Sequence, residues 1–152
     1  TFVGKPKVDA LKYLIELLAE TTIATVNEKY EGKTKLTGLV ICAVDSMTAR
    51  EMIWKHVKGK LSVPCYIDGR MGAEVARIYT INPLDPQHQA MYESELYPSS
   101  EAEHIPCSAK ATIYAAMLIG ALIASLVKRF AMNQPYPTEL MVDCPGYSIF
   151  AS

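Results

Sequence analysis

The 152-residue sequence lacks both paired cysteines and a charge excess, and each absence excludes a class of protein. The four cysteines include no C-x-x-C pair, which excludes a compact zinc ribbon as a local motif. Fifteen Lys and Arg oppose sixteen Asp and Glu, so the net charge of -1 creates no positive field to attract nucleic acid or an anionic membrane. We therefore expect neither nucleic acid nor a membrane as a partner.

A leader and a disordered composition are also missing. The chain starts at Thr1 without a basic stretch followed by an apolar one, so we expect no secretory signal and a fragment or processed chain. Without disulfide-like spacing, the thiols are predicted to be reduced and the chain cytoplasmic. Half of the residues are apolar and 20% are charged, which excludes intrinsic disorder. The length predicts a single domain over residues 1–152.

Two amphipathic helices are predicted in the first third of the chain. Apolar residues recur at helical spacing over residues 6–19, and Pro6 suits the first turn because a proline needs no N–H partner there. A second helix is predicted over residues 47–57, with Ser46 or Asp45 available as its N-cap.

The predicted strands complete an α/β pattern. They lie at residues 21–26, 39–44, 63–67 and 73–81. The run 39–44 is continuously apolar, as in a parallel strand buried on both faces, and 73–81 reads as an antiparallel partner. Two further strand-like runs, LMVDC and YSIFA, surround a Pro-Gly turn near the end of the chain. Residues 82–105 have no sustained period and predict a long, potentially functional excursion.

Residues 111–127 form the longest apolar run of the sequence. About seventeen residues is the lower limit for a helix that spans a bilayer. Thr112, Tyr114 and Ser125 within the run fit a helix enclosed by protein. We therefore predict a buried or interface helix, with a membrane span as the alternative.

Asp45 lies directly after the predicted buried strand 39–44 and beside a helix start. Because open α/β sheets bind ligands outside the carboxyl ends of their strands, Asp45 is a candidate for metal or ligand contact. The alternative is a plain N-cap. Arg50 follows in the first turn, where arginines are commonly solvated or paired with an acid. The segment 68–70, Asp-Gly-Arg, follows another predicted strand and is expected to line the same crevice.

Lys7 and Cys107 are the other candidate site residues. Lys7 lies at a predicted helix start, where free N–H groups and a lysine together suit a phosphate, although such a lysine also serves solubility alone. Cys107 precedes the apolar helix, and a helix N-terminus lowers the pKa of a thiol. His104 is close enough in sequence to be considered as its base, and a structural thiol is the alternative.

Four segments resemble the second half of ThiF/MoeB/E1-like adenylyltransferases, over roughly residues 3–130. They are G-K-P-K-V-D-A-L, V-I-C-A-V-D-S-M-T-A-R, P-C-Y-I-D-G-R-M-G-A-E-V and I-P-C-S-A-K-A-T-I-Y. The resemblance implies a Rossmann-like, mostly parallel sheet with flanking helices, lacking the N-terminal nucleotide-binding strands. It also implies an ATP-dependent, magnesium-requiring nucleotidyltransferase that activates the C-terminal carboxylate of a ubiquitin-like or sulfur-carrier protein.

The resemblance also implies roles for individual residues. Lys7 falls in the family's triphosphate-contacting position and Asp45 in its magnesium or adenylate position. Arg50 closes the D-S-x-x-x-R signature, and Cys107 lies near the thioester-forming cysteine of some noncanonical members. The attacking carboxylate is already ionised at neutral pH, so catalysis would consist mainly of positioning and of neutralising phosphate charge.

The chain departs from the family in two features. The Gly-rich nucleotide loop, the acidic ribose-binding residue and the upstream arginines precede the G-x-P-K helix and have no counterpart here, and the four-cysteine zinc site is missing. In the family's sheet the missing strands lie between those predicted at 21–26 and 39–44, so we expect a gap there and exposed edges prone to association.

Three functions therefore remain open from the sequence. The first is part of an adenylyltransferase, inactive without the missing half, working as a homodimer or with that half supplied. The second is a noncatalytic E1-like dimerisation or interaction module. The third is a small α/β enzyme that uses Cys107 as a nucleophile and needs no nucleotide.

Overall fold

The computed structural model describes residues 2–97 and 112–152 and divides into two compact units, Thr1–Glu31 and Gly32–Ser152. The first unit contains helix α1 (Lys7–Ala19), which confirms the helix predicted from Pro6 onward. No side chain of α1 is buried. In the described part of the chain, all buried side chains belong to the second unit.

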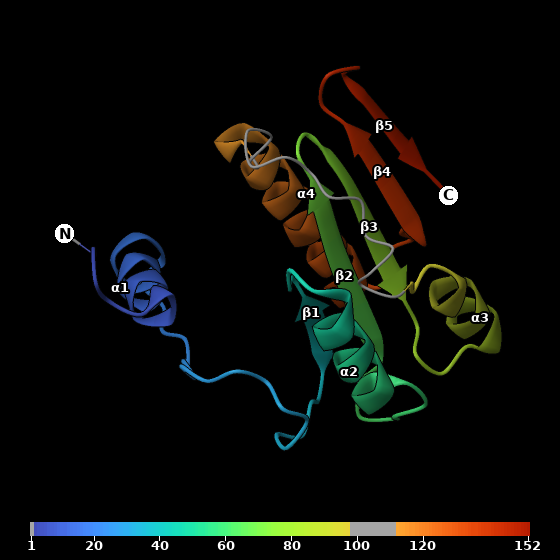
Figure 1. Cartoon of the computed structure of the whole chain (residues 1–152), viewed down its shortest axis with the longest axis horizontal. Coiled ribbons are helices and arrows are strands. Elements are labelled where there is room, and N and C mark those ends of the chain that lie inside the picture. The colour runs from blue at the N-terminus through green and yellow to red at the C-terminus, as the bar shows by residue number, and fades with distance from the viewer. Residues whose placement is uncertain (1, 98–111) are drawn as a thin grey trace. The chain divides into compact units, whose positions relative to one another are not determined.

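The second unit is built on one five-stranded sheet (Figure 1). Its strands, in chain order and also in spatial order, are β1 (Leu39–Cys42), β2 (Cys65–Gly72), β3 (Val75–Ile81), β4 (Glu139–Asp143) and β5 (Ser148–Ala151). Its helices are α2 (Met47–Val57), α3 (Pro86–Ser94) and α4 (Ile113–Ala131). β1 and β2 are parallel, and every other neighbouring pair is antiparallel.

The prediction of a Rossmann-like, mostly parallel sheet is wrong. Parallel neighbours require a crossover connection, and α2 supplies one between β1 and β2. The short turns that follow β2 and β4 can join only antiparallel strands. The predicted antiparallel partner at 73–81 is confirmed as β3, and LMVDC and YSIFA as the β4–β5 hairpin.

The strand predicted at 21–26 is also wrong, because residues 21–37 form neither helix nor strand. Its β-branched residues favour an extended backbone, but a strand also needs a neighbour for its N–H and C=O groups, and this segment pairs with no described strand. The expected gap inside the sheet is therefore absent from the described strands. Instead β1, the most continuously apolar strand, lies at an edge, and its Ile41 side chain is 48% exposed.

Two boundaries differ from the sequence prediction. β2 does not stop at Asp68 but continues through Gly72. The segment 82–97 contains α3, whose start is fixed by Asp85: its carboxylate accepts from the N–H groups of Gln87 and His88, and Pro86 occupies the first helical turn.

The two faces of the sheet have different partners, because side chains alternate along each strand. One face packs against α4, which crosses behind the strands in Figure 1. This core cluster consists of Cys65, Ile67, Ala76, Ile78, Ile119, Leu126, Leu140 and Val142. The other face is aromatic and packs against α2 and α3: Trp54, Tyr66, Tyr79 and Tyr92 lie in ring contact.

Within residues 2–97 and 112–152, α4 alone is long and apolar enough to cross a membrane by length and composition. Only 17% of the 18-residue apolar stretch of α4 is buried. Ala115, Ile119 and Leu126 form its buried stripe, so α4 packs on the sheet along one side and is not fully enclosed by the described chain.

Candidate functional site

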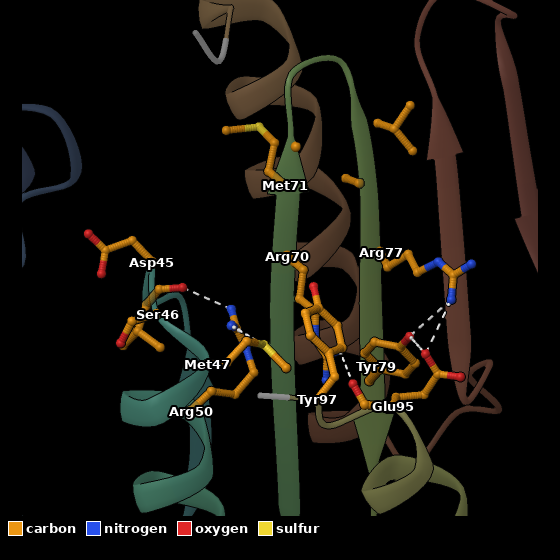
Figure 2. A pocket seen from close by; sticks show the side chains of 14 residues that line it. Asp45, Ser46, Met47, Arg50, Arg70, Met71, Arg77, Tyr79, Glu95 and Tyr97 are labelled. Carbon is orange, nitrogen blue, oxygen red and sulfur yellow. Dashed lines mark hydrogen bonds and ion pairs between the residues drawn. The ribbon is translucent and has the colours of Figure 1, made fainter. Parts of the chain in front are cut away.

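A cavity of about 550 Å³ opens at the carboxyl end of β1, between the start of α2 and the β2–β3 hairpin (Figure 2). The segment after β1 and the first turn of α2 form one wall, and β2 and β3 form another. Residues that follow α3 complete the lining. The lining residues include Asp45, Ser46, Met47, Arg50, Arg70, Arg77, Tyr79, Glu95 and Tyr97.

Ser46, and not Asp45, caps α2. The Ser46 hydroxyl accepts a hydrogen bond from the Ala49 N–H at 3.1 Å, and the Ser46 backbone is extended, as an N-cap requires. Asp45 is exposed and lines the cavity. The capping alternative for Asp45 is therefore wrong, and its carboxylate remains available for a ligand or metal ion.

Arg50 is buried at the base of the cavity, with only 4% of its surface exposed. Its Nε donates to Asp68 Oδ1 at 2.7 Å, and one Nη donates to the Val44 carbonyl at 2.8 Å. The remaining Nη lies 3.3 Å from the Met47 sulfur. Arg50 is therefore paired with an acid, and its guanidinium joins the start of α2 to β2 and to the segment that follows β1.

Arg70 approaches the same carboxylate from the other side. Its Nε donates to Asp68 Oδ2 at 2.7 Å, and Nη1 donates to the Glu95 carbonyl at 2.7 Å. The guanidinium carbon lies 4.6 Å from the ring centre of Tyr79 and 5.4 Å from that of Tyr92, which fixes its plane. Nη2 is buried and has no hydrogen-bond partner among the described residues.

One carboxylate thus serves two buried cations. Asp68 is fully buried, and its Oδ2 also accepts from the Tyr92 hydroxyl at 2.9 Å. Burial lowers the pKa of Arg50 and of Arg70, but the charge of Asp68 and its hydrogen bonds outweigh burial and leave both pKa values above normal. Burial, followed by Asp68, raises the pKa of Tyr92, which therefore stays a neutral donor. This buried group carries a net positive charge.

At the rim of the cavity, one arginine pairs with two carboxylates. Arg77 lies 3.3 Å from Glu95 Oε2 and 3.5 Å from Glu139 Oε1. The Tyr79 hydroxyl donates to the same Glu95 oxygen at 2.9 Å. Because the Arg77 side chain is 46% exposed, solvent screens these pairs, and they contribute little to stability.

Arg77, Tyr79, Glu95 and Tyr97 were missed by sequence reasoning. A usable signal existed for Arg77 and Tyr79. The β2–β3 register places Arg70 opposite Arg77 and Asp68 opposite Tyr79. Extending β2 to a turn at 73–74 would have predicted these pairs from alternation alone. The expectation that 68–70 lines the crevice with Asp45 holds for Arg70, although from within a strand.

The other sequence-predicted site residues lie elsewhere. Lys7 is on α1 in the first unit, so its role beside Asp45 stays a prediction. Cys107, with His104, lies outside the described residues.

Asp45 is the candidate metal ligand that the sequence suggests. Among residues 2–97 and 112–152 there is no cluster of three or more His, Cys, Asp or Glu side chains suited to a metal. Magnesium commonly binds through one or two carboxylates together with waters and substrate phosphates, so a single exposed aspartate fits a phosphate-borne magnesium but not a resident metal centre.

No protein-family model matches the chain, and no curated protein is significantly similar to it.

Proposed function

We propose that the chain is part of an ATP-dependent adenylyltransferase that activates the C-terminal carboxylate of a ubiquitin-like or sulfur-carrier protein. One observation supports this proposal above others. Asp45, Ser46 and Arg50 of the D-S-x-x-x-R segment line one cavity with Arg70 of the I-D-G-R segment, and the Arg50–Asp68–Arg70 ion pairs join the two segments.

The proposed roles follow from the side-chain environments. Asp45, exposed at the cavity, would hold magnesium, which neutralises phosphate charge when bound with ATP. Lys7 would contact the triphosphate. Arg50 has its guanidinium occupied by Asp68, Val44 and Met47, so it positions the start of α2 and does not itself contact phosphate.

Assembly is part of the proposal. The described strands do not include the nucleotide-binding half expected from the resemblance, so activity requires that half from a further segment or another chain. The apolar edge strand β1, with Ile41 half-exposed, is the type of edge that associates. We place this assembly in the cytoplasm, because free buried cysteines such as Cys42 and Cys65 suit a reducing compartment.

The second candidate is a noncatalytic E1-like interaction module. It is favoured by the exposed apolar side chains of α4, among them Ile113 at 79% and Met117 at 69% exposed. Such a module would use the second unit as a scaffold and would need neither Asp45 nor magnesium.

Pyrophosphate exchange into ATP, dependent on a ubiquitin-like or sulfur-carrier substrate, tests the proposal. We expect none from residues 1–152 alone and a clear rate from the protein with its nucleotide-binding half. There, Asp45→Ala should lower exchange by roughly a hundredfold, the scale for one group that stabilises transition-state charge. Cys107→Ser should leave adenylation unchanged.

The alternatives give different results. Loss with Cys107→Ser alone would favour thiol chemistry, and unchanged function in both variants would favour the interaction module. Exchange by residues 1–152 alone would overturn the requirement for the missing half.

A further inference from the structure

The buried end of the cavity contains one more cation than it has carboxylates. Arg50 and Arg70 both pair with Asp68, and no second acid takes part in those contacts. Glu95 contributes its backbone carbonyl to Arg70, while its carboxylate is engaged with Arg77 and Tyr79. A buried charge without a counter-charge is costly, which makes this end of the cavity receptive to an anion.

One nitrogen of the Arg70 guanidinium has no hydrogen-bond partner among the described residues. Nε and Nη1 are used by Asp68 and Glu95, whereas Nη2 is buried and unpartnered in the described part of the chain. The side chain is only 14% exposed, and it lines the cavity. Figure 2 shows Arg70 on β2, between Arg50 and the Tyr79–Glu95 pair.

Arg70 is also held rigidly before any ligand arrives. Two hydrogen bonds and the rings of Tyr79 and Tyr92 fix the position and plane of its guanidinium. Binding to a preorganised donor loses little side-chain entropy, and hydrogen bonds between a guanidinium and an oxyanion are among the strongest in proteins.

We propose that Arg70 is the anion-binding residue of this cavity and that its Nη2 donates to an oxygen of a phosphate or carboxylate group. The inference deepens the proposed function: the choice between a nucleotide phosphate and an acyl carboxylate as the ligand rests on that function. The anion-binding site itself rests only on the contacts of Arg70. Asp45 and Arg70 line the same cavity from different walls, so a ligand that bridges both would place its anion at Arg70 and a metal ion at Asp45.

Titration of the 15N-labelled chain with inorganic phosphate tests this directly. We expect the Nε–Hε signal of one buried arginine to shift saturably with phosphate, and not with chloride at equal ionic strength. Acetate provides the second arm: tighter binding of phosphate would indicate a nucleotide phosphate, and tighter binding of acetate a substrate carboxylate. No saturable shift with either probe would overturn the proposal, with Nη2 satisfied by water alone.

Arg70→Lys and Arg77→Lys form a matched pair, because each keeps the positive charge at the same cavity. Removal of the fixed Nη2 donor should weaken phosphate binding roughly tenfold in Arg70→Lys, whereas Arg77→Lys should change it less than about twofold. Equal weakening would show that general positive potential, and not Arg70, attracts the anion. If Arg70→Lys does not fold, the titration of the wild-type chain with phosphate still tests whether the anion binds.

The two proposals fail separately. Phosphate binding at Arg70 without pyrophosphate exchange in the completed protein would retain the anion site and remove the adenylyltransferase. Pyrophosphate exchange that is insensitive to Arg70→Lys, together with no phosphate-dependent shift, would retain the adenylyltransferase and remove the anion site at Arg70.

Discussion

At the scale of the residue, Asp68 is the side chain on which the buried part of the cavity depends. It is fully buried and accepts from Arg50, Arg70 and Tyr92. Each of these donors would lose its partner if the carboxylate were removed, and two of them are charged.

Asp68→Asn should therefore lower the free energy of unfolding by about 3–5 kcal/mol, because it leaves two buried guanidinium groups without a counter-charge. Urea unfolding followed by fluorescence of Trp54, the one tryptophan of the chain, measures this effect. Asp45→Asn is the matched control and should change the free energy by less than about 0.5 kcal/mol, since Asp45 is exposed. A similar effect in the two variants would contradict the buried network.

Cys65 makes stability depend on pH in the alkaline range. Burial raises the pKa of its thiol from 9.0 to about 11. The unfolded chain therefore loses this proton first, and the contribution of Cys65 is complete below pH 9 and declines up to about pH 11. We expect the difference in free energy of unfolding between wild type and Cys65→Ala to shrink across that window. A constant difference would mean that the thiol titrates normally.

Sequence reasoning at this scale identified Asp45 and Arg50 but not the reason for Arg50. A first-turn arginine is consistent with several partners, and its carboxylate lies on a strand eighteen positions away. Only the parallel pairing of β1 with β2 brings Asp68 beside α2. Contacts between elements of this kind require the topology, which local patterns do not contain.

At the scale of the element, α2 is the helix that builds the site, and its start depends on Ser46. Ser46→Ala should lower the free energy of unfolding by about 1 kcal/mol, the usual effect of losing an N-cap. Ser46→Asp retains an accepting oxygen and should remain close to wild type. Both are measured by urea unfolding. If Asp45→Ala produced the larger loss, the cap would belong to Asp45 instead.

For α4, the structure predicts that the stripe facing the sheet determines stability. Leu126 is 2% exposed within the core cluster, so Leu126→Ala should cost about 2–5 kcal/mol. Met117 is 69% exposed, and Met117→Ala should cost less than about 0.5 kcal/mol. Thermal unfolding of the two variants in the absence of detergent compares them. A neutral Leu126→Ala would contradict packing of α4 against β2 and β3.

Local signals predicted most elements but failed for residues 21–26 and for α3. The Pro6 start of α1, the N-cap before α2 and the long apolar run of α4 were sufficient, because caps and apolar runs are local properties. Residues 21–26 satisfied the strand pattern without a pairing partner. α3 was missed because its polar composition hid the cap formed by Asp85 and Pro86.

At the scale of the whole molecule, the second unit contains the complete buried core of the described chain. Residues 32–152 should therefore fold without residues 1–31, and their urea midpoint should lie close to that of the full chain. Trp54 fluorescence follows both chains. A second unit that fails to unfold cooperatively would show that α1 is needed for its stability.

The mixed direction of the strands was the least predictable feature of the second unit. A continuously apolar strand such as β1 is typical of the centre of a parallel sheet, and strand–helix–strand spacing correctly predicted one such pair. The remaining strands take their direction from short turns, notably Ala73 with a φ of 53° between β2 and β3. Sheet order thus follows from chain connectivity more than from the polarity of any single strand.

The β2–β3 hairpin also sets the order in which the molecule can assemble. Its ladder begins beside its own turn, with Gly72 opposite Val75, and closes with little loss of chain entropy, whereas Leu39 reaches Cys65 only after the whole of α2 is in place. We expect Arg70 and Arg77 to be aligned early and the wall that contains Asp45 to arrive late. During refolding, the protein should then bind its ligand no earlier than α2 packs against the sheet, even when most of the sheet is already formed.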